Sequence, residues 1–319
     1  MKTVILDGFA INPGDLEWDF LKKYGEYSVY DQSTDEQVAQ RIGNAEIVVT
    51  NRMKITSEVI KKCPNLKFIS AFGTGYDMID VKACRENGIE VCNIPGYSTV
   101  SVAQFAFSLM LAISTRIDRF SSAVTEGTWT GRPEFAYQTI PYVELSGKTV
   151  GVYGCGNIGL QFAKQCKAFG MRVLAYRRSI SEGTVDGIEY VSADKLIRES
   201  DFISLHCPLT DKTRGLVNKE FLDKMKKGAY LINTSRGAVI NENDLYNALV
   251  SGHLAGAAID VMVKEPPERT NPLLTLDNCI ITPHAAWVSI EARKRLISIL
   301  CNNIESFIQT GEGINRVFS

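Results

Sequence analysis

The feature that most constrains this chain is a glycine-rich turn between a buried apolar strand and a helix. The turn, GCGNIG at 154–159, follows the short β-branched run Thr149–Tyr153 and precedes apolar residues at helical spacing over Leu160–Phe169. A second apolar run, Arg172–Tyr176, completes a strand–helix–strand unit. A unit of this kind belongs to a parallel sheet covered by helices, so the sequence predicts an α/β fold.

Each glycine of this turn has a physical role, and together these roles predict a dinucleotide site. Gly154 lets the chain leave the strand sharply, Gly156 lets the backbone approach a pyrophosphate, and Gly159 lets the helix pack against the strand. The start of the helix then offers unpaired N–H groups and the positive end of its dipole to the phosphates. Asn157 and Ile158, in the turn itself, are also expected to bind the cofactor. A structural turn is the alternative, but the strand–helix context favours the cofactor site.

The end of the second strand predicts which dinucleotide binds. An NAD site needs an acidic residue about 20 positions past the glycines to accept the ribose 2′-OH. Here Arg177 and Arg178 follow the strand, and no carboxylate appears before Glu182. Guanidinium groups would bind a 2′-phosphate, so we expect NADP to be preferred, with NAD possible. The alternative is that both arginines are solvated surface charges.

Length and charge narrow the class of protein. A chain of 319 residues exceeds one ordinary core and predicts two domains. The net charge of −1 gives no basic field for nucleic acid or an acidic membrane, and we expect neither as a partner. The eight cysteines form no CxxC pair and no metal site is expected, while the lack of a signal peptide predicts a cytoplasmic protein.

Alternating strand and helix patterns run along most of the chain. The first region, to about Tyr97, is predicted to be a small α/β domain, followed by a long helix over Ser98–Asp118. Thr125–Glu144 is irregular and rich in glycine, proline and aromatic residues, among them Trp129, Phe135 and Tyr137, so we expect an interface arm. Later strands are predicted at Phe202–His206, Ala229–Asn233, Leu254–Val261 and Cys279–Thr282, and a last amphipathic helix at Ile290–Gln309.

Three residues with complementary chemistry follow the carboxyl ends of predicted strands, where ligands bind in open parallel sheets. They are Arg236 in NTSRG, Glu265 in DVMVKEPP and His284 in TPHAAW. Arginine can hold a carboxylate, histidine can transfer a proton, and a carboxylate beside the histidine favours its charged form. Taken singly, they could be a helix cap, a loop acid and a core histidine; jointly they predict an active site.

Two other histidines are less suited to be the acid. His206 ends a strand in HCPLT, which suggests a loop that lines a cofactor. His253 precedes a strand and therefore lies at its amino end, on the other edge of the sheet.

The motifs FGTGYDMID, NIPGYSTVSVAQ, GKTVGVYGCGNIG, HCPLTDKTRGLVN, NTSRGAVI and TPHAAW occur in one order over essentially the whole chain. In this the chain resembles the D-isomer-specific 2-hydroxyacid dehydrogenases. The resemblance implies two Rossmann-like or flavodoxin-like parallel-sheet domains with a cleft between them. Residues 1–99 with 290–319 would form the substrate-binding domain, and 100–289 the dinucleotide-binding domain. The family usually forms dimers through the arm at Thr125–Glu144.

The resemblance also implies roles for single residues. Arg236, Glu265 and His284 would be catalytic, and the amides of Thr74 and Gly75 would bind the substrate carboxylate. Trp287 and Arg236 would also contact substrate. The remaining positions would line the cofactor: Cys207, Pro208, Thr213, Thr234, Ser235 and Asp260.

Within the family, GYSTVSVAQ, EGTWT and Trp287 are most similar to glycerate dehydrogenases and hydroxypyruvate reductases. The expected reaction is hydride transfer between NAD(P)H and a small 2-keto acid, hydroxypyruvate or glyoxylate first, to give a D-2-hydroxy acid. One alternative is a D-lactate or other D-2-hydroxyacid dehydrogenase. An alternative of another class is a non-catalytic NAD(P)-sensing binding protein.

Overall fold

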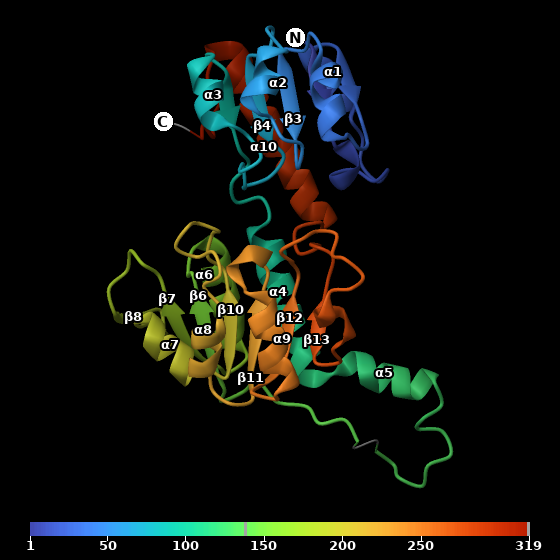
Figure 1. The fold of residues 1–319 in the computed structure, drawn as a ribbon, viewed down its shortest axis with the longest axis vertical. Helices are drawn as coiled ribbons and strands as arrows, with labels where there is room; N and C mark the ends of the chain where they lie inside the picture. Colours follow the sequence, from blue (N-terminus) through green and yellow to red (C-terminus); the bar gives the residue numbers. More distant parts are fainter. Residues whose placement is uncertain (137–138, 318–319) are drawn as a thin grey trace. The chain divides into compact units, whose positions relative to one another are not determined.

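The computed structural model describes residues 1–136 and 139–317 (Figure 1). The chain divides into two compact units. One is made of Met1–Ser98 and Val288–Ser319, and the other is Thr99–Trp287. Each unit has its own parallel sheet.

The smaller unit contains a five-stranded sheet in the order β2-β1-β3-β4-β5, parallel throughout. Buried apolar residues fill most of these short strands, which is typical of a sheet covered on both faces. The strands are β1 (Thr3–Ile5), β2 (Tyr27–Val29), β3 (Ile47–Thr50), β4 (Phe68–Ala71) and β5 (Glu90–Cys92).

Four α-helices accompany this sheet. They are α1 (Val38–Ile42), α2 (Ser57–Lys61), α3 (Val81–Glu86) and the long C-terminal α10 (Ile290–Thr310). Arg293 anchors α10 although it is only 6% exposed, because its guanidinium donates to both oxygens of Asp15 and to the carbonyl of Ile11. The last segment of the chain is thereby joined to the first.

The larger unit contains an eight-stranded sheet in the order β13-β12-β11-β10-β6-β7-β9-β8. The order reverses between β6 and β10, and such a reversal creates the crevice in which doubly wound sheets bind ligands. Its strands are β6 (Thr149–Tyr153), β7 (Arg172–Tyr176), β8 (Gly183–Val185), β9 (Ile188–Tyr190), β10 (Phe202–Leu205), β11 (Ala229–Asn233), β12 (Leu254–Ile259) and β13 (Cys279–Ile281).

Helices cover both faces of this sheet. On one face α4 (Thr99–Thr115) and α6 (Asn157–Ala168) bury Phe107, Met110 and Phe162 against Val150 and Val152. The other face is covered by α7 (Ala193–Glu199), α8 (Lys219–Lys224) and α9 (Glu242–Val250), whose apolar residues share a core with β10 and β11. A two-sided core of this kind explains the continuous apolar runs of the central strands.

The structure departs from two sequence-based expectations. The helix predicted over Ser98–Asp118 ends at Thr115, because Arg116 adopts a φ of 53° and α5 (Ile117–Thr125) begins after it. The sheet is also not wholly parallel, since the short exposed β8 pairs antiparallel with β9 at its edge. Among the described helices no single one is long and apolar enough to cross a membrane, and only the bent pair α4 and α5 passes that test jointly.

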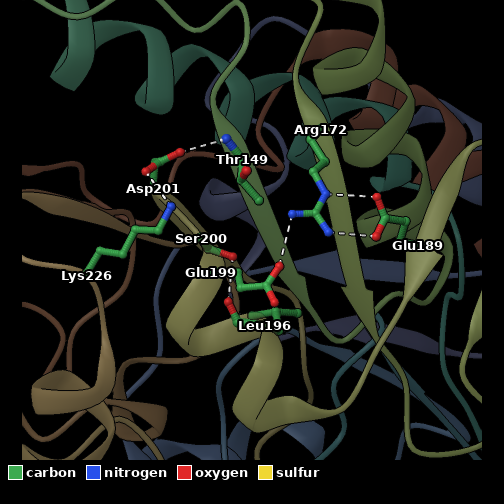
Figure 2. Close-up of polar contacts among 8 residues, drawn as sticks. All are labelled: Thr149, Arg172, Glu189, Leu196, Glu199, Ser200, Asp201 and Lys226. Atoms are coloured by element: carbon green, nitrogen blue, oxygen red, sulfur yellow. Dashed lines mark hydrogen bonds and ion pairs between the residues drawn. The ribbon is translucent and has the colours of Figure 1, made fainter.

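Ionic contacts gather at the amino ends of β6, β7 and β10 (Figure 2). Arg172 pairs with both oxygens of Glu189 at 2.8 and 2.9 Å and with Glu199 at 3.0 Å. Asp201 accepts the amide of Thr149 at 2.8 Å and pairs with Lys226. These side chains are partly exposed, between 31% and 43%, so each pair contributes at most about 1 kcal/mol to stability.

Candidate active site

The turn after β6 requires glycine at two of its three glycine positions. Gly154 has a φ of 98°, and a Cβ there would lie 2.6 Å from the amide nitrogen of Cys207, which follows β10. A Cβ on Gly159 would lie 2.6 Å from the carbonyl oxygen of Gly154, so α6 could not pack against β6. Around Gly156, by contrast, no described atom beyond its two chain neighbours lies within 4 Å of an added Cβ. Its backbone therefore borders open space, as pyrophosphate binding requires.

The first turn of α6 offers free hydrogen-bond donors beside this space. The amides of Asn157 and Ile158 donate to no group within residues 1–136 and 139–317. The N-cap residue is Gly156, which has no side chain to cap them. Because the 12-residue helix also directs the positive end of its dipole here, the turn fits the pyrophosphate of a dinucleotide.

Two arginines follow the second strand of this unit. The carbonyl of Tyr176, the last residue of β7, accepts the amide of Gly154 at 3.0 Å, so this strand end lies beside the glycine turn. Arg177 and Arg178 come next, and both are exposed. Positive charge is therefore available where the adenosine ribose of a dinucleotide lies in a Rossmann fold.

The segment after β10 is a loop held by a threonine hydroxyl. Cys207 and Pro208 lie two and three residues after the end of the strand, and Thr213 Oγ1 donates to the carbonyl of Pro208 at 2.7 Å. The same oxygen accepts the amide of Thr210 at 2.7 Å, so the Thr213 hydroxyl is used within its own loop. Burial raises the pKa of the Cys207 thiol to about 11, which makes this cysteine a poor nucleophile at neutral pH.

The loop after β11 carries the buried hydroxyl of Thr234. Thr234 Oγ1 is buried and makes no hydrogen bond within the described part of the chain. The neighbouring Ser235 hydroxyl donates to Asn233 Oδ1 at 2.8 Å and is thereby satisfied. Because buried polar groups are normally paired, the unpaired Thr234 hydroxyl is consistent with a bound group at this edge of the sheet.

His284 and Glu265 contact each other. His284 Nδ1 lies 2.8 Å from Glu265 Oε2, and the other carboxylate oxygen accepts the amide of Met262 at 3.0 Å. About a quarter of each side chain is exposed, 26% for the histidine and 25% for the glutamate. The contact fixes the orientation of the ring and directs Nε2 away from Glu265.

Asp260 builds the turn that carries His284. Its carboxylate accepts hydrogen bonds from Thr282 Oγ1 at 2.6 Å and from the amides of Ala285 and Ala286 at 2.8 and 2.9 Å. The amide of His284 donates to the backbone carbonyl of Asp260 at 2.8 Å. These bonds hold His284 at a φ of 56°, in the left-handed region, which costs on the order of 1 kcal/mol or more for a non-glycine residue. Burial raises the pKa of the Asp260 carboxyl.

Arg236 lies on the loop after β11, next to the loop that carries Glu265. Its Nη1 donates to the carbonyl of Ser235 at 2.9 Å, and its own carbonyl accepts Asn233 Nδ2 at 3.0 Å. At the following position, Gly237, a Cβ would lie 2.0 Å from the carbonyl carbon of Met262. Only glycine permits this backbone approach, so the two loops are packed together.

The three expected catalytic residues thus follow three neighbouring strands. Arg236 comes after β11, Glu265 after β12 and His284 after β13. The structure brings Glu265 and His284 into hydrogen-bond contact and places the loop of Arg236 against that of Glu265. Trp287, also expected to contact substrate, ends the larger unit three residues beyond His284.

The other two histidines lie apart from this pair. The ring of His206 packs against Phe162 at 5.0 Å and hydrogen-bonds Ser204 Oγ at 2.9 Å. Part of the residue reaches solvent, but the ring is desolvated, and this burial lowers the pKa of His206 to about 3. His253 precedes β12 and bonds the carbonyl of Leu222 at 2.8 Å.

The expected carboxylate-binding residues lie in the smaller unit. Thr74 and Gly75 follow β4, at the carboxyl edge of its sheet. Thr74 Oγ1 donates to the carbonyl of Ile94 at 3.0 Å, so the hydroxyl serves to fix the loop.

The sequence interpretation missed residues that hold the Glu265 loop. Glu242, in the first turn of α9, accepts the amide of Val263 at 2.7 Å and Asn271 Nδ2 at 2.8 Å. An acidic residue in a helix's first turn is common for dipole reasons, so sequence alone did not distinguish it. Asp260 was expected to line the cofactor, and the sequence did not indicate that its carboxylate holds the turn of His284.

A doubly wound sheet with a glycine turn at its switch point and an acid–base pair at the same edge is the arrangement of a nicotinamide-dependent dehydrogenase. More particularly, the chain belongs to the D-isomer-specific 2-hydroxyacid dehydrogenases, since residues 107–286 match the NAD-binding domain of that family.

Known proteins are similar to this chain over nearly its full length. A hydroxypyruvate reductase of Blautia hydrogenotrophica is 46% identical over 99% of each chain. An acyclic imino acid reductase, solved with NADPH and D-Arg, has a TM-score of 0.87 at 32% identity and covers 100% of both chains. The NAD-dependent formate dehydrogenase of Staphylococcus aureus, solved with NAD, has a TM-score of 0.87 at 28% identity over 100% of this chain and 99% of its own. The chain is therefore an oxidoreductase that uses a nicotinamide cofactor.

Proposed function

We propose that this protein reduces hydroxypyruvate or glyoxylate to the corresponding D-2-hydroxy acid, with NADPH as the preferred cofactor. The full-length similarity to a hydroxypyruvate reductase supports the substrate class. The observation that carries the proposal is the 2.8 Å contact between His284 Nδ1 and Glu265. It supplies a correctly oriented proton donor at the ligand-binding edge of the sheet.

The residues divide the work of the reaction. The reduced nicotinamide supplies the hydride when it is bound. His284 delivers the proton from Nε2 to the carbonyl oxygen of the keto acid, while Glu265 stabilises the imidazolium before transfer. Arg236 binds the substrate carboxylate and polarises the neighbouring carbonyl. Thr74 and Gly75 contribute backbone amides for the carboxylate, and Trp287 contacts the substrate.

A panel of 2-keto acids tests this function. We expect hydroxypyruvate and glyoxylate to give higher kcat/KM with NADPH than pyruvate or branched 2-keto acids, and the product of hydroxypyruvate to be the D isomer. Preference for pyruvate would indicate a D-lactate dehydrogenase instead. Cofactor binding with no reduction of any 2-keto acid would indicate the nucleotide-sensing alternative and overturn the proposal.

The preference for NADPH rests on Arg177 and Arg178, which follow β7 where NAD sites need an acidic residue. Each charge-assisted contact to a 2′-phosphate is worth about 1.5–3 kcal/mol, or roughly tenfold to a hundredfold in affinity. Arg177→Asp should therefore shift the preference towards NADH, whereas Lys227→Asp, the same charge change before β11 at the amino edge, should not. A wild type with a higher kcat/KM for NADH would refute this part.

We propose a homodimer on a separate observation, the exposed aromatic residues of the arm at Thr125–Glu144. Trp129 is 41% exposed, Phe135 95% and Tyr142 59%; Tyr137 lies outside the described residues. Figure 1 shows α5 and the chain after it reaching away from the sheet of their own unit. Large apolar side chains on such a segment suit a second copy of the chain. Sedimentation should show a dimer for the wild type and a monomer for the double variant Trp129→Ser, Phe135→Ser. A wild type that is monomeric at micromolar concentration would refute the proposed dimer.

A further inference from the structure

The carboxylate of Glu242, in the first turn of α9, joins the two ends of the loop that carries Glu265. Its Oε1 accepts the amide of Val263 at 2.7 Å, just before Glu265. Its Oε2 accepts Asn271 Nδ2 at 2.8 Å, at the far end of the loop. That asparagine is itself fixed, because its Oδ1 accepts a backbone amide of the following 3₁₀ helix at 3.0 Å. One side chain therefore closes the segment 263–271.

Glu242 lies on the same stretch of chain as Arg236, since both follow β11. This stretch also meets the next loop at Gly237, where a Cβ would lie 2.0 Å from the carbonyl carbon of Met262 and 2.1 Å from its oxygen. The peptide group that joins Met262 to Val263 is thus held on both sides. Gly237 packs against its C=O, and Glu242 accepts its N–H. Because the peptide is planar, fixing both groups fixes its orientation.

This peptide group leads directly to the acid–base pair. The amide of Met262 donates to one oxygen of Glu265 at 3.0 Å, and the other oxygen lies 2.8 Å from His284 Nδ1. On the other side of the contact, Arg236 directly precedes Gly237. The position of the arginine relative to the histidine therefore depends on this contact between the loops. Their spacing matters, because a keto acid has to reach a charge for its carboxylate and a proton donor for its carbonyl at once.

We propose that Glu242 is a positioning residue that sets the spacing between the substrate-binding arginine and the proton-donating histidine. It acts through the Val263 amide and Asn271, and it does not touch the substrate. The inference rests on the proposed function, which assigns Arg236 to the substrate carboxylate and His284 to proton transfer. The alternative is that Glu242 only stabilises the dipole of α9, as acidic residues in a first turn commonly do.

The expected kinetic effect is on kcat and not on KM. Removing the carboxylate releases the Val263 amide and lets the loop of Glu265 shift against the loop of Arg236. The arginine still binds the keto acid, so KM should stay within about threefold of wild type. A reacting group displaced by about 1 Å costs up to about a hundredfold in rate, so kcat of Glu242→Ala should fall about tenfold to a hundredfold. The Kd of NADPH should not change.

Asp244 offers a matched control on the same helix. It also lies in the first turn of α9, and its carboxylate also accepts a backbone amide, that of Lys219 at 2.9 Å. That amide belongs to the first residue of α8 and not to a catalytic loop. Asp244→Ala therefore removes the same charge from the helix dipole and a similar hydrogen bond, while both catalytic loops stay joined. We expect Asp244→Ala to keep the wild-type kcat.

The experiment measures kcat and KM for hydroxypyruvate, together with amide hydrogen exchange over residues 262–271. The proteins are wild type, Glu242→Ala, Glu242→Gln and Asp244→Ala. We expect faster exchange and a lower kcat in Glu242→Ala, and wild-type values of both in Asp244→Ala. Glutamine keeps one oxygen for the Val263 amide, but its NH2 group cannot accept from Asn271 Nδ2, so its kcat should be intermediate. If Glu242→Ala does not fold, Glu242→Gln carries the comparison.

Several results would overturn the inference. If wild type reduces 2-keto acids and the folded Glu242 variants keep its kcat, the positioning role is wrong while the proposed function stands. A raised KM with unchanged kcat, or an equal loss of kcat in Asp244→Ala, would also overturn it, because neither is an effect on the spacing of the two loops. A wild type that reduces no 2-keto acid would refute the proposed function. Unchanged exchange over 262–271 in Glu242→Ala would then overturn the inference separately.

Discussion

Replacing Glu265 with glutamine keeps the shape of the side chain and removes its charge. One oxygen of Glu265 accepts the Met262 amide at 3.0 Å, and the other lies 2.8 Å from His284 Nδ1. Glutamine keeps the first bond only by turning its carbonyl oxygen to Met262, which points its NH2 group at Nδ1. Because an NH2 group cannot accept from a protonated Nδ1, the imidazolium loses its partner.

The size of the effect follows from that lost bond. A hydrogen bond to a charged group contributes about 1.5–3 kcal/mol, and the partial exposure of both side chains, 25% and 26%, places it at the lower end. About 1.4 kcal/mol corresponds to a factor of ten in rate. At neutral pH, kcat/KM for reduction by Glu265→Gln should therefore fall roughly tenfold.

The assay is kcat/KM for hydroxypyruvate reduction at neutral pH, measured for wild type and Glu265→Gln. Glu268→Gln is the matched control, because Glu268 is 62% exposed and pairs with Lys264 three residues from the site. We expect the control to keep the wild-type kcat/KM. An unchanged kcat/KM in Glu265→Gln would refute the assignment of this carboxylate.

Two further predictions concern packing and acid stability. Gly237→Ala places a Cβ 2.0 Å from the Met262 carbonyl carbon. The free energy of unfolding in urea should therefore fall by about 1–3 kcal/mol, and kcat/KM should fall at least about tenfold. Wild-type values of both quantities would contradict the packing argument. The pKa of His206 is about 3 in the folded protein and 6.5 in the unfolded chain. Between pH 6.5 and pH 3 the unfolded chain therefore binds more protons, and the free energy of unfolding falls as the pH drops through this range. At pH 5 this amounts to about 2 kcal/mol, and a His206→Gln variant that loses as much stability as wild type between pH 7 and pH 5 would contradict it.

The dinucleotide unit could be predicted in detail because its signals are local. The strand Arg172–Tyr176 has the predicted bounds, but α6 begins at Asn157 and not at Leu160. The difference arises because the first turn of the helix contains Gly159 and lacks an apolar repeat. The break at Arg116 had no local signal, since neither glycine nor proline marks it and contacts with Asp277 hold it.

The sequence predicts which chemical groups lie at the sheet edge. It does not predict the hydrogen bonds that hold those groups in place. Arg236, Glu265 and His284 follow strands, so topology alone predicts that they share an edge. The roles of Asp260 and Glu242 depend on which backbone groups their side chains reach, and these partners come from other loops. Such contacts between distant segments leave no periodic pattern in the sequence.

The most direct test of the account is the effect of His284→Ala on hydroxypyruvate reduction, measured together with the Kd of NADPH. Loss of the proton donor should lower kcat/KM by about 10²–10⁴-fold. The Kd of NADPH should stay within about twofold of wild type, because the glycine turn and the arginines after β7 lie on other strands of the sheet. Near-normal turnover in His284→Ala would contradict the account, since the proton would then come from another group.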